Sequence, residues 1–208
     1  MNILVCGVGG QGVLLFSDII SDLALRNGLD IKKSEVHGLA QRGGSVTSHI
    51  RFGPNVYSPL IEEGTADAVV AFERLEALRY VHFLSPSGRL FYDSHRIDPL
   101  PVSIGAAERV PDDQIETRLA ARAPHRQMVP AFKTALELGN VRVQNTVMLG
   151  AVSSCLGFPD ESIRQSLTEL VKPAARDLNL KAFAAGQAIS ACPSPGGLPL
   201  RLTSAGGA

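Results

Sequence analysis

Three glycines near the start of the chain have the spacing of a dinucleotide-binding turn. The stretch from Val5 to Leu15 is VCGVGGQGVLL, with the pattern Gly7-x-Gly9-x-x-Gly12. In such a turn the first glycine permits a tight bend after a strand, the second lets the backbone approach a phosphate, and the third lets helix and strand pack closely. The helix that follows offers free N–H groups and a partial positive charge to an anion. The same glycines also suit a strand that turns sharply into a helix without any ligand, so this pattern alone leaves both interpretations open.

A polar loop further along the chain supplies a second group of candidate residues. It runs from Ser34 to Ser48 with the sequence SEVHGLAQRGGSVTS. Arg42, followed by Gly43 and Gly44, puts a guanidinium group beside bare backbone, and this combination suits a phosphate or a carboxylate. The alternative is a surface hairpin whose arginine is solvated.

A nicotinamide or flavin cofactor requires one more residue, an acidic side chain near the end of the second strand that binds the ribose hydroxyls. Glu35 is the candidate for this role. Gln11, between the glycines, is unusual for such a site. A self-contained nicotinamide- or flavin-binding oxidoreductase therefore stays open as an alternative function.

Composition argues against several classes of partner. The 208 residues include 20 basic and 20 acidic side chains, which cancel, so the chain has no electrostatic footprint for nucleic acid or an anionic membrane. No segment approaches the roughly 18 to 20 apolar residues of a membrane span. The start of the sequence lacks the features of a signal peptide, and we expect a cytoplasmic protein. Cys6, Cys155 and Cys192 lie too far apart for an iron–sulfur cluster or a structural zinc, so we expect reduced, mostly buried thiols.

Hydrophobic patterning predicts strands that alternate with helices. The predicted strands are 2–6, 29–36, 45–52, 66–72, 89–92 and 128–132, and the predicted helices are 13–26, 73–83, 143–156, 159–171 and 173–186. This alternation indicates an α/β fold, Rossmann-like, with an open, mostly parallel sheet, helices on both faces and C-terminal helices. Residues 93–125 give no assignment. The periodicity is lost near residue 190, so we predict one domain over residues 1–188 and a flexible tail over 189–208.

Several motifs, in order along the chain, resemble the gamma-type domain of 2-oxoacid:ferredoxin oxidoreductases. They are GVGGQGVLL, SEVHGLAQRGGSVTSHIRFG, VYSPLIEEGTADAVVAFERLEALRY, NTVMLGAVSSCLGFPDESI and LNLKAFAAG. Together they cover most of residues 1–188. The form SEVHGLAQRGG is similar to the arylpyruvate branch of the family, which includes the enzymes that act on indolepyruvate.

This resemblance implies a division of labour between two subunits. The family decarboxylates a 2-oxoacid on thiamine diphosphate, passes electrons singly through iron–sulfur clusters to ferredoxin, and transfers the acyl group to coenzyme A. In the arylpyruvate enzymes, thiamine diphosphate, Mg²⁺ and the 4Fe-4S clusters belong to a large partner subunit. This chain has neither cluster-type cysteine spacing nor a GDG-type thiamine motif. The resemblance therefore implies a small subunit that binds no cofactor alone and is inactive without its partner.

The resemblance also implies a role for the two glycine-containing segments. Coenzyme A carries a diphosphate, so the turn is expected to contact coenzyme A phosphates, the partner subunit, or both. The expected binding residues are Gly7, Gly9, Gly10, Gln11, Gly12, Glu35, Arg42, Gly43 and Gly44, and we expect no catalytic or metal-binding residue.

Two further segments have an expected interface role. The family pattern places YSPLIEEG, residues 57–64, on the same side as the glycine turn, and the helix that begins near Glu73 contributes an interface or a plain amphipathic surface. A third class of function, an interaction module with a vestigial glycine turn, predicts partner binding that is indifferent to coenzyme A.

Overall fold

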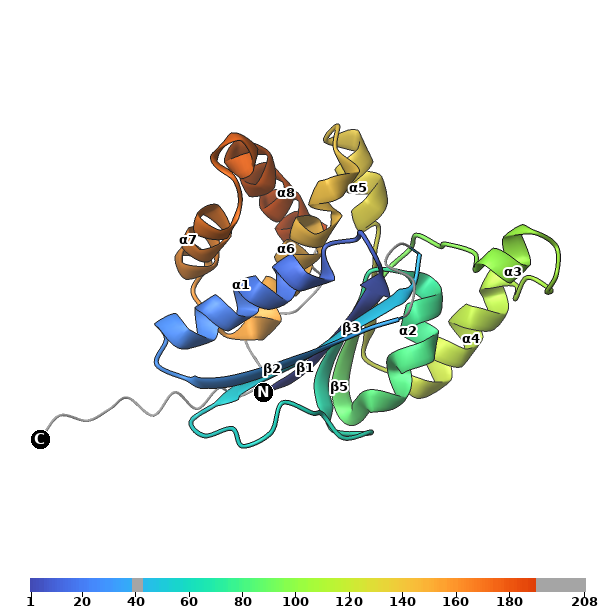
Figure 1. Ribbon diagram of the computed structural model, residues 1–208, viewed down its shortest axis with the longest axis horizontal. Helices are drawn as coiled ribbons and strands as arrows, with labels where there is room; N and C mark the ends of the chain where they lie inside the picture. Colours follow the sequence, from blue (N-terminus) through green and yellow to red (C-terminus); the bar gives the residue numbers. More distant parts are fainter. Residues whose placement is uncertain (39–42, 190–208) are drawn as a thin grey trace, which may run out of the picture.

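A computed structural model describes residues 1–38 and 43–189, and its described strands form one sheet (Figure 1). The strands are β1 (Asn2–Val8), β2 (Asp30–His37), β3 (Ser45–Gly53), β4 (Ala66–Ala71), β5 (Leu84–Asp93) and β6 (Arg126–Val129). Their order across the sheet is β2-β3-β1-β4-β5-β6. β3 pairs antiparallel with both β1 and β2, whereas β1, β4, β5 and β6 are parallel neighbours. The predicted open, mostly parallel sheet is confirmed, with β3 as the strand that runs the other way.

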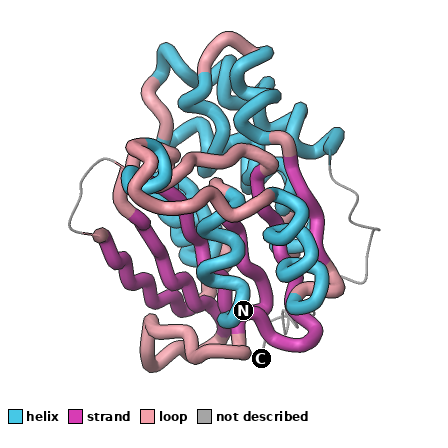
Figure 2. The backbone as a smooth tube through the Cα atoms, turned by 90° about the vertical axis from the view of Figure 1, so that its right-hand side faces the viewer, coloured by secondary structure: helices cyan, strands magenta, loops and turns pink. Residues whose placement is uncertain are grey.

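Helices cover both faces of this sheet, as predicted. They are α1 (Val13–Arg26), α2 (Arg74–Tyr80), α3 (Leu100–Ser103), α4 (Asp112–Arg122), α5 (Ala131–Glu137), α6 (Gln144–Leu156), α7 (Asp160–Leu170) and α8 (Arg176–Ile189), with 3₁₀ turns at Val81–Phe83, Val141–Val143 and Pro173–Ala175. α1 and α5–α8 lie on one face, and α2 and α4 lie on the other (Figure 1). Figure 2 shows the strands side by side between these helices. None of the helices in the described residues is long and apolar enough to cross a membrane.

Each face of the sheet has its own hydrophobic core. The core on the α1 face contains Phe16, Ile20 and Leu23 of α1, which packs against the sheet, α6 and α7. These side chains recur at helical spacing, and burial of each contributes about 1.5–3 kcal/mol. α1 ends at the predicted place, because Asn27 caps it and Gly28 follows with a φ of +70°.

The structure corrects the expected strand at 128–132. β6 is Arg126–Val129, and Pro130 precedes helix α5. Proline lacks the N–H that would continue the ladder, so pairing stops before it. Residues 93–125, which gave no assignment, contain α3 and α4. Of the predicted tail, Ile189 belongs to α8, and residues 190–208, with Cys192, lie outside the described part of the chain; the other two cysteines, Cys6 and Cys155, are buried.

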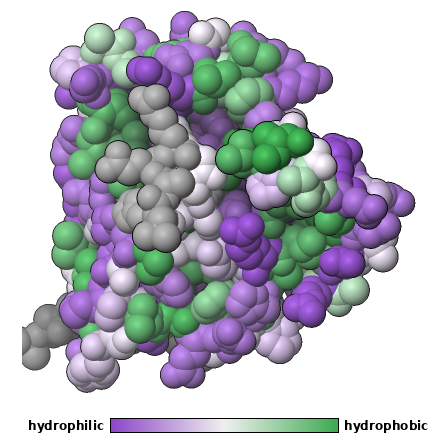
Figure 3. All heavy atoms as spheres, turned by 45° about the vertical axis from the view of Figure 1, so that its right-hand side comes forward, coloured by the Kyte–Doolittle hydropathy of each residue, from purple (hydrophilic) through white to green (hydrophobic). Residues whose placement is uncertain are grey.

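The segment from residue 94 to residue 111 is fixed by a cluster of ion pairs. The guanidinium of Arg96, only 8% exposed, donates to Asp98 at 2.5 Å and to Asp112 at 2.6 Å, and Arg109 also pairs with Asp98 at 3.2 Å. These contacts tie the segment to the start of α4, whereas Leu100 in α3 is 72% exposed. Figure 3 shows hydrophobic patches separated by hydrophilic side chains on one face of the molecule.

The loop that contains YSPLIEEG lies at the opposite edge from the glycine turn. β3 runs antiparallel to β1, so Ser45 pairs with Val8 and Arg51 pairs with Asn2. The chain after β3 therefore emerges where β1 begins, and the Asn2 side chain donates to the Thr65 carbonyl at 3.1 Å. The expectation that residues 57–64 share the side of the glycine turn is wrong.

Helices α6 and α8 pack with their backbones in direct contact at two glycines. A Cβ on Gly150 would lie 2.1 Å from the carbonyl oxygen of Phe183, and a Cβ on Gly186 would lie 2.0 Å from that of Val147. No side chain fits at these distances, so the two glycines set how closely the helices approach.

We predict that Gly150→Ala lowers the free energy of unfolding by about 1–3 kcal/mol, because the added methyl group forces α6 and α8 apart. The measurement is the midpoint of urea unfolding. Gly53→Ala is the matched control, since a Cβ there meets nothing within 4 Å. Equal midpoints for the two variants would contradict the close packing.

Candidate functional site

The glycine turn joins β1 to α1 as the sequence predicts. Gly12 is the N-cap of α1 with a φ of +82°, and Gly10 has a φ of +103°, conformations that residues with a Cβ rarely adopt. Gly7 is required for space, because a Cβ there would lie 2.9 Å from the side-chain oxygen of Gln11 and 3.1 Å from Phe72. The turn lies at the carboxyl edge of the parallel strands, where α/β folds bind ligands.

The side chain of Gln11 folds back into the turn and fixes its conformation through two hydrogen bonds. Its Oε1 accepts a hydrogen bond from the backbone N–H of Val8 at 2.7 Å. Its Nε2 donates to the carbonyl oxygen of Phe72, just beyond the end of β4, at 2.8 Å. The residue that was unusual between the glycines therefore ties the turn to the neighbouring strand.

A second amide, from Gln144 at the start of α6, reaches the same carbonyl. Gln144 Nε2 lies 2.8 Å from the Phe72 oxygen and 2.8 Å from Oδ2 of Asp93. Asp93, the fully buried last residue of β5, also accepts from the N–H groups of His95 at 2.9 Å and Phe132 at 2.7 Å. Burial raises the pKa of the Asp93 carboxyl, although these hydrogen bonds oppose the shift. Sequence reasoning missed this network, since its partners are far apart in the chain and no local pattern connects them.

The N-terminus of α6 also contacts the turn directly. Asn145 lies so close to Gly12 that a Cβ on the glycine would be 2.6 Å from its side-chain nitrogen. The same nitrogen is 3.4 Å from the carbonyl oxygen of Gly12. The third glycine of the pattern thus makes room for α6, which differs from the expected role in packing α1 against the sheet.

The structure brings the second glycine pair to the turn. The N–H of Gly9 donates to the carbonyl oxygen of Gly44 at 2.9 Å. Gly43, with a φ of +78°, is exposed at the same edge. Arg42 lies outside the described residues. Of the nine expected residues, the six glycines and Gln11 therefore lie together at the carboxyl edge of the sheet. These seven residues form the glycine edge.

Glu35 lies on β2, away from the glycine turn, and not beside it as expected for a ribose-binding carboxylate. Its Oε1 pairs with Lys33 Nζ at 2.8 Å and lies 3.5 Å from the hydroxyl of Ser17 in α1. β3 separates β2 from β1, so Glu35 is not on the strand beside the glycine turn. This order removes the arrangement by which a carboxylate binds the ribose of a dinucleotide, and it weighs against the nicotinamide alternative.

A hollow of about 410 Å³ lies on the α1 side of the turn, and one of about 460 Å³ lies on the α2 side. Aliphatic side chains and glycines line the first, whereas the second contains Ser45, Glu76 and Arg79. The α1-side hollow is therefore apolar, whereas the α2-side hollow combines charged and polar side chains with apolar ones such as Leu75 and Ile97.

The two glutamates of α2 are buried, which corrects the expectation of a plain amphipathic surface. Glu73 caps α2 by accepting from the Glu76 N–H at 2.9 Å, and its other oxygen accepts from the Ile97 N–H at 3.0 Å. Burial raises the pKa of Glu73. Glu76 accepts from the hydroxyl of Ser45 and pairs with Arg79 at 3.2 Å. These contacts fix the wall of the α2-side hollow.

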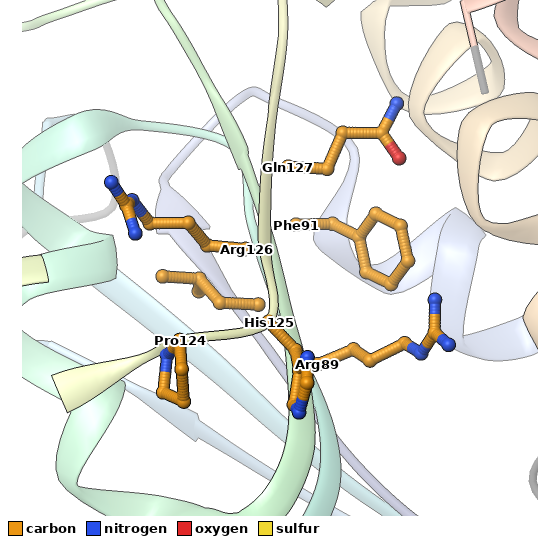
Figure 4. Close-up of a pocket in the computed structure, with 7 residues that line it drawn as sticks. Arg89, Phe91, Pro124, His125, Arg126 and Gln127 are labelled. Carbon is orange, nitrogen blue, oxygen red and sulfur yellow. The ribbon is translucent and has the colours of Figure 1, made fainter. Parts of the chain in front are cut away.

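A smaller hollow of about 280 Å³ lies beside the start of β6, the outermost strand of the sheet, and away from the glycine turn. Figure 4 shows that Arg89 and Arg126, which line it, point to opposite sides of the strand. Their charges do not converge on one point, so this hollow is a poorer candidate for an anion than the glycine edge.

Comparison with known proteins decides the family. The family model described as pyruvate ferredoxin/flavodoxin oxidoreductase matches residues 2–189. The chain belongs to this family. Indolepyruvate oxidoreductase subunit IorB of Archaeoglobus fulgidus is 41% identical over 198 residues, covering 93% of this chain and 98% of the relative. Subunit IorB of Thermococcus kodakarensis is 38% identical over 188 residues, covering 89% and 93%.

Two solved structures share the fold of this chain. The gamma subunit of a keto/oxoacid ferredoxin oxidoreductase from Geobacter sulfurreducens aligns with a TM-score of 0.67 at 22% identity, covering 91% of this chain and 97% of that one. A 2-oxoglutarate:ferredoxin oxidoreductase from Magnetococcus marinus, solved with 2-oxoglutarate, coenzyme A and succinyl-CoA bound, aligns with a TM-score of 0.68 at 21% identity. This chain covers 31% of that longer chain and is itself 91% covered. The resemblance and the fold class inferred from the motifs are confirmed.

The two hydrogen bonds of the Gln11 side chain give a testable prediction. Gln11→Glu keeps an acceptor for Val8 but turns a carboxylate oxygen toward the Phe72 carbonyl, so at neutral pH we expect the free energy of unfolding to fall by about 1–3 kcal/mol. Acidification should restore part of this loss, because the introduced carboxyl group, once protonated, can again donate to Phe72.

The measurement is urea unfolding at neutral and at mildly acidic pH. Gln114→Glu on the exposed surface of α4 is the matched control and should stay close to the parent chain. A Gln11 variant as stable as this control at both pH values would show that the hydrogen bonds of Gln11 contribute nothing to the free energy of unfolding.

Proposed function

We propose that this chain is the small subunit of an indolepyruvate:ferredoxin oxidoreductase. It acts in the cytoplasm and completes the active site of a larger subunit that carries thiamine diphosphate, Mg²⁺ and iron–sulfur clusters, with ferredoxin as the electron acceptor. The observation that carries the proposal is the match along nearly the whole length of IorB, with 41% identity over 98% of the A. fulgidus subunit. Relatives of that similarity and coverage support the same role.

In the complex, thiamine diphosphate supplies the decarboxylation chemistry, and this chain contributes binding and orientation. The glycine edge fits the diphosphate of coenzyme A. A Cβ on Gly10 or on Gly43 would meet nothing within 4 Å, so a ligand can reach the backbone at both positions. The first intrahelical bond of α1 runs from the N–H of Phe16 to the carbonyl of Gly12, which leaves the N–H groups of residues 13–15 without an acceptor inside the helix. These donors and the helix dipole favour a phosphate.

The remaining expected residues have supporting parts in this proposal. Gly7 and Gln11 shape the turn, Gly9 and Gly44 join it to the loop, and Gly12 seats α6 behind it. Arg42 adds a guanidinium for a phosphate or a partner carboxylate. Glu35, paired with Lys33, braces the strand that leads into the loop.

Subunit reconstitution tests the proposed role. The separately purified large subunit, with indolepyruvate and coenzyme A, is assayed for reduction of ferredoxin or a viologen dye with and without this chain. We expect activity only when both chains are present. Full activity of the large subunit alone would overturn the proposal, and nicotinamide binding to the isolated chain would then be the next measurement.

Arg42→Ala tests the coenzyme A assignment. Loss of a charge-assisted hydrogen bond costs about 1.5–3 kcal/mol, so the apparent KM for coenzyme A in the reconstituted enzyme should rise about tenfold or more. Arg118→Ala, on the exposed face of α4, is the control and should leave the KM unchanged. An unchanged KM for the Arg42 variant would contradict the assignment of this loop to coenzyme A.

A further inference from the structure

Asn145, the second residue of α6, is a buried polar residue whose side chain contacts the start of another helix. It is 2% exposed, and its side-chain nitrogen lies 3.4 Å from the carbonyl oxygen of Gly12, the N-cap of α1. A Cβ on Gly12 would lie 2.6 Å from the same nitrogen. The absence of a side chain at Gly12 therefore lets an amide of α6 reach the backbone where α1 begins.

The orientation of the Asn145 amide is set by its hydrogen bonds. Its Oδ1 accepts from the backbone N–H of Thr146 at 2.9 Å, so its NH₂ group faces Gly12 and donates to the carbonyl there. The Thr146 hydroxyl donates to Oδ1 of Asn179 in α8 at 2.6 Å, and Asn179 donates to the carbonyl of Ala175 at 2.9 Å. A chain of hydrogen bonds thus runs from α8 through α6 to the N-cap of α1.

The carbonyl that Asn145 contacts belongs to the same peptide unit as the N–H of Val13. This N–H is one of those that α1 leaves without an acceptor inside the helix. The peptide unit is planar and trans, so its carbonyl and its N–H point in opposite directions. The Gly12 carbonyl also accepts from the N–H of Phe16 at 3.1 Å. Donors that hold this carbonyl therefore fix the direction of the Val13 N–H and polarise it.

We propose that Asn145 is a positioning residue for coenzyme A, an inference that rests on the function proposed above. Asn145 is buried and acts through Gly12, by holding the N–H of Val13 in the direction in which α1 offers its donors to the diphosphate. A donor that is fixed before the ligand arrives loses little conformational freedom on binding, so Asn145 contributes to the affinity for coenzyme A. The chemical steps take place in the larger subunit, and the rate at saturating coenzyme A does not depend on Asn145.

The test is the steady-state kinetics of the reconstituted enzyme with Asn145→Ala in this chain. We expect the KM for coenzyme A to rise about three- to tenfold, the effect of one hydrogen bond, while kcat and the KM for indolepyruvate stay within about twofold of the parent values. Asn145→Asp keeps the shape of the side chain but turns an oxygen toward Gly12, and it should raise the KM at least as far. Because the alanine variant carries no charge, agreement between the two variants excludes repulsion of the phosphates as the cause.

Ser153→Ala is the matched control, because Ser153 is a buried polar residue further along α6 whose hydroxyl donates to the Gly150 carbonyl at 2.8 Å. It should leave the KM for coenzyme A unchanged. An unchanged KM for coenzyme A in either Asn145 variant would overturn the inference. A joint change in kcat and in both KM values would also overturn it, since a general loss of structure affects all three. A parent enzyme whose activity does not depend on coenzyme A would instead overturn the proposed function, and this outcome needs no variant.

Discussion

The carboxyl edge of the sheet is organised by one backbone carbonyl, that of Phe72. A carbonyl oxygen has two lone pairs, and here both accept side-chain amides, one from Gln11 in the glycine turn and one from Gln144 in α6. Gln144 also donates to Asp93, the last residue of β5. Three neighbouring strands and the helix that crosses their ends are therefore connected through a buried polar network. Loss of the Gln144 side chain would remove one donor from the Phe72 carbonyl and one from Asp93 at a buried position, which is costly for both acceptors.

The conformation of the glycine turn therefore depends on contacts with several other parts of the domain. The turn is bonded to β4 through Gln11, to the loop before β3 through Gly44, and it contacts α6 through Asn145. A loop that keeps its conformation only through its own residues would change shape easily when a ligand or a partner approached. The glycine edge instead presents a preformed surface, which lowers the entropy lost when a second molecule binds to it.

Local pattern predicted much of the fold and only part of the site. α1 was placed correctly because its apolar residues repeat every three to four positions and Asn27-Gly28 ends it. The glycine turn followed from spacing in the same way. The insertion of β3 between β1 and β2 could not be predicted, because strand pairing depends on contacts between distant residues, and this misplaced both Glu35 and residues 57–64. The role of Gln11 was hidden for a similar reason, since its partner Phe72 lies 61 positions away.

The contact between Gly150 and Gly186 links the beginning of the chain to a much later part of it. α8 packs on α6 at these glycines, and α6 in turn seats its first residues against the glycine turn. During synthesis the ribosome releases the turn first, yet the helix that fixes α6 emerges more than a hundred residues later. The glycine turn encoded in the first dozen residues is therefore packed against its final neighbours only when translation has passed Gly186.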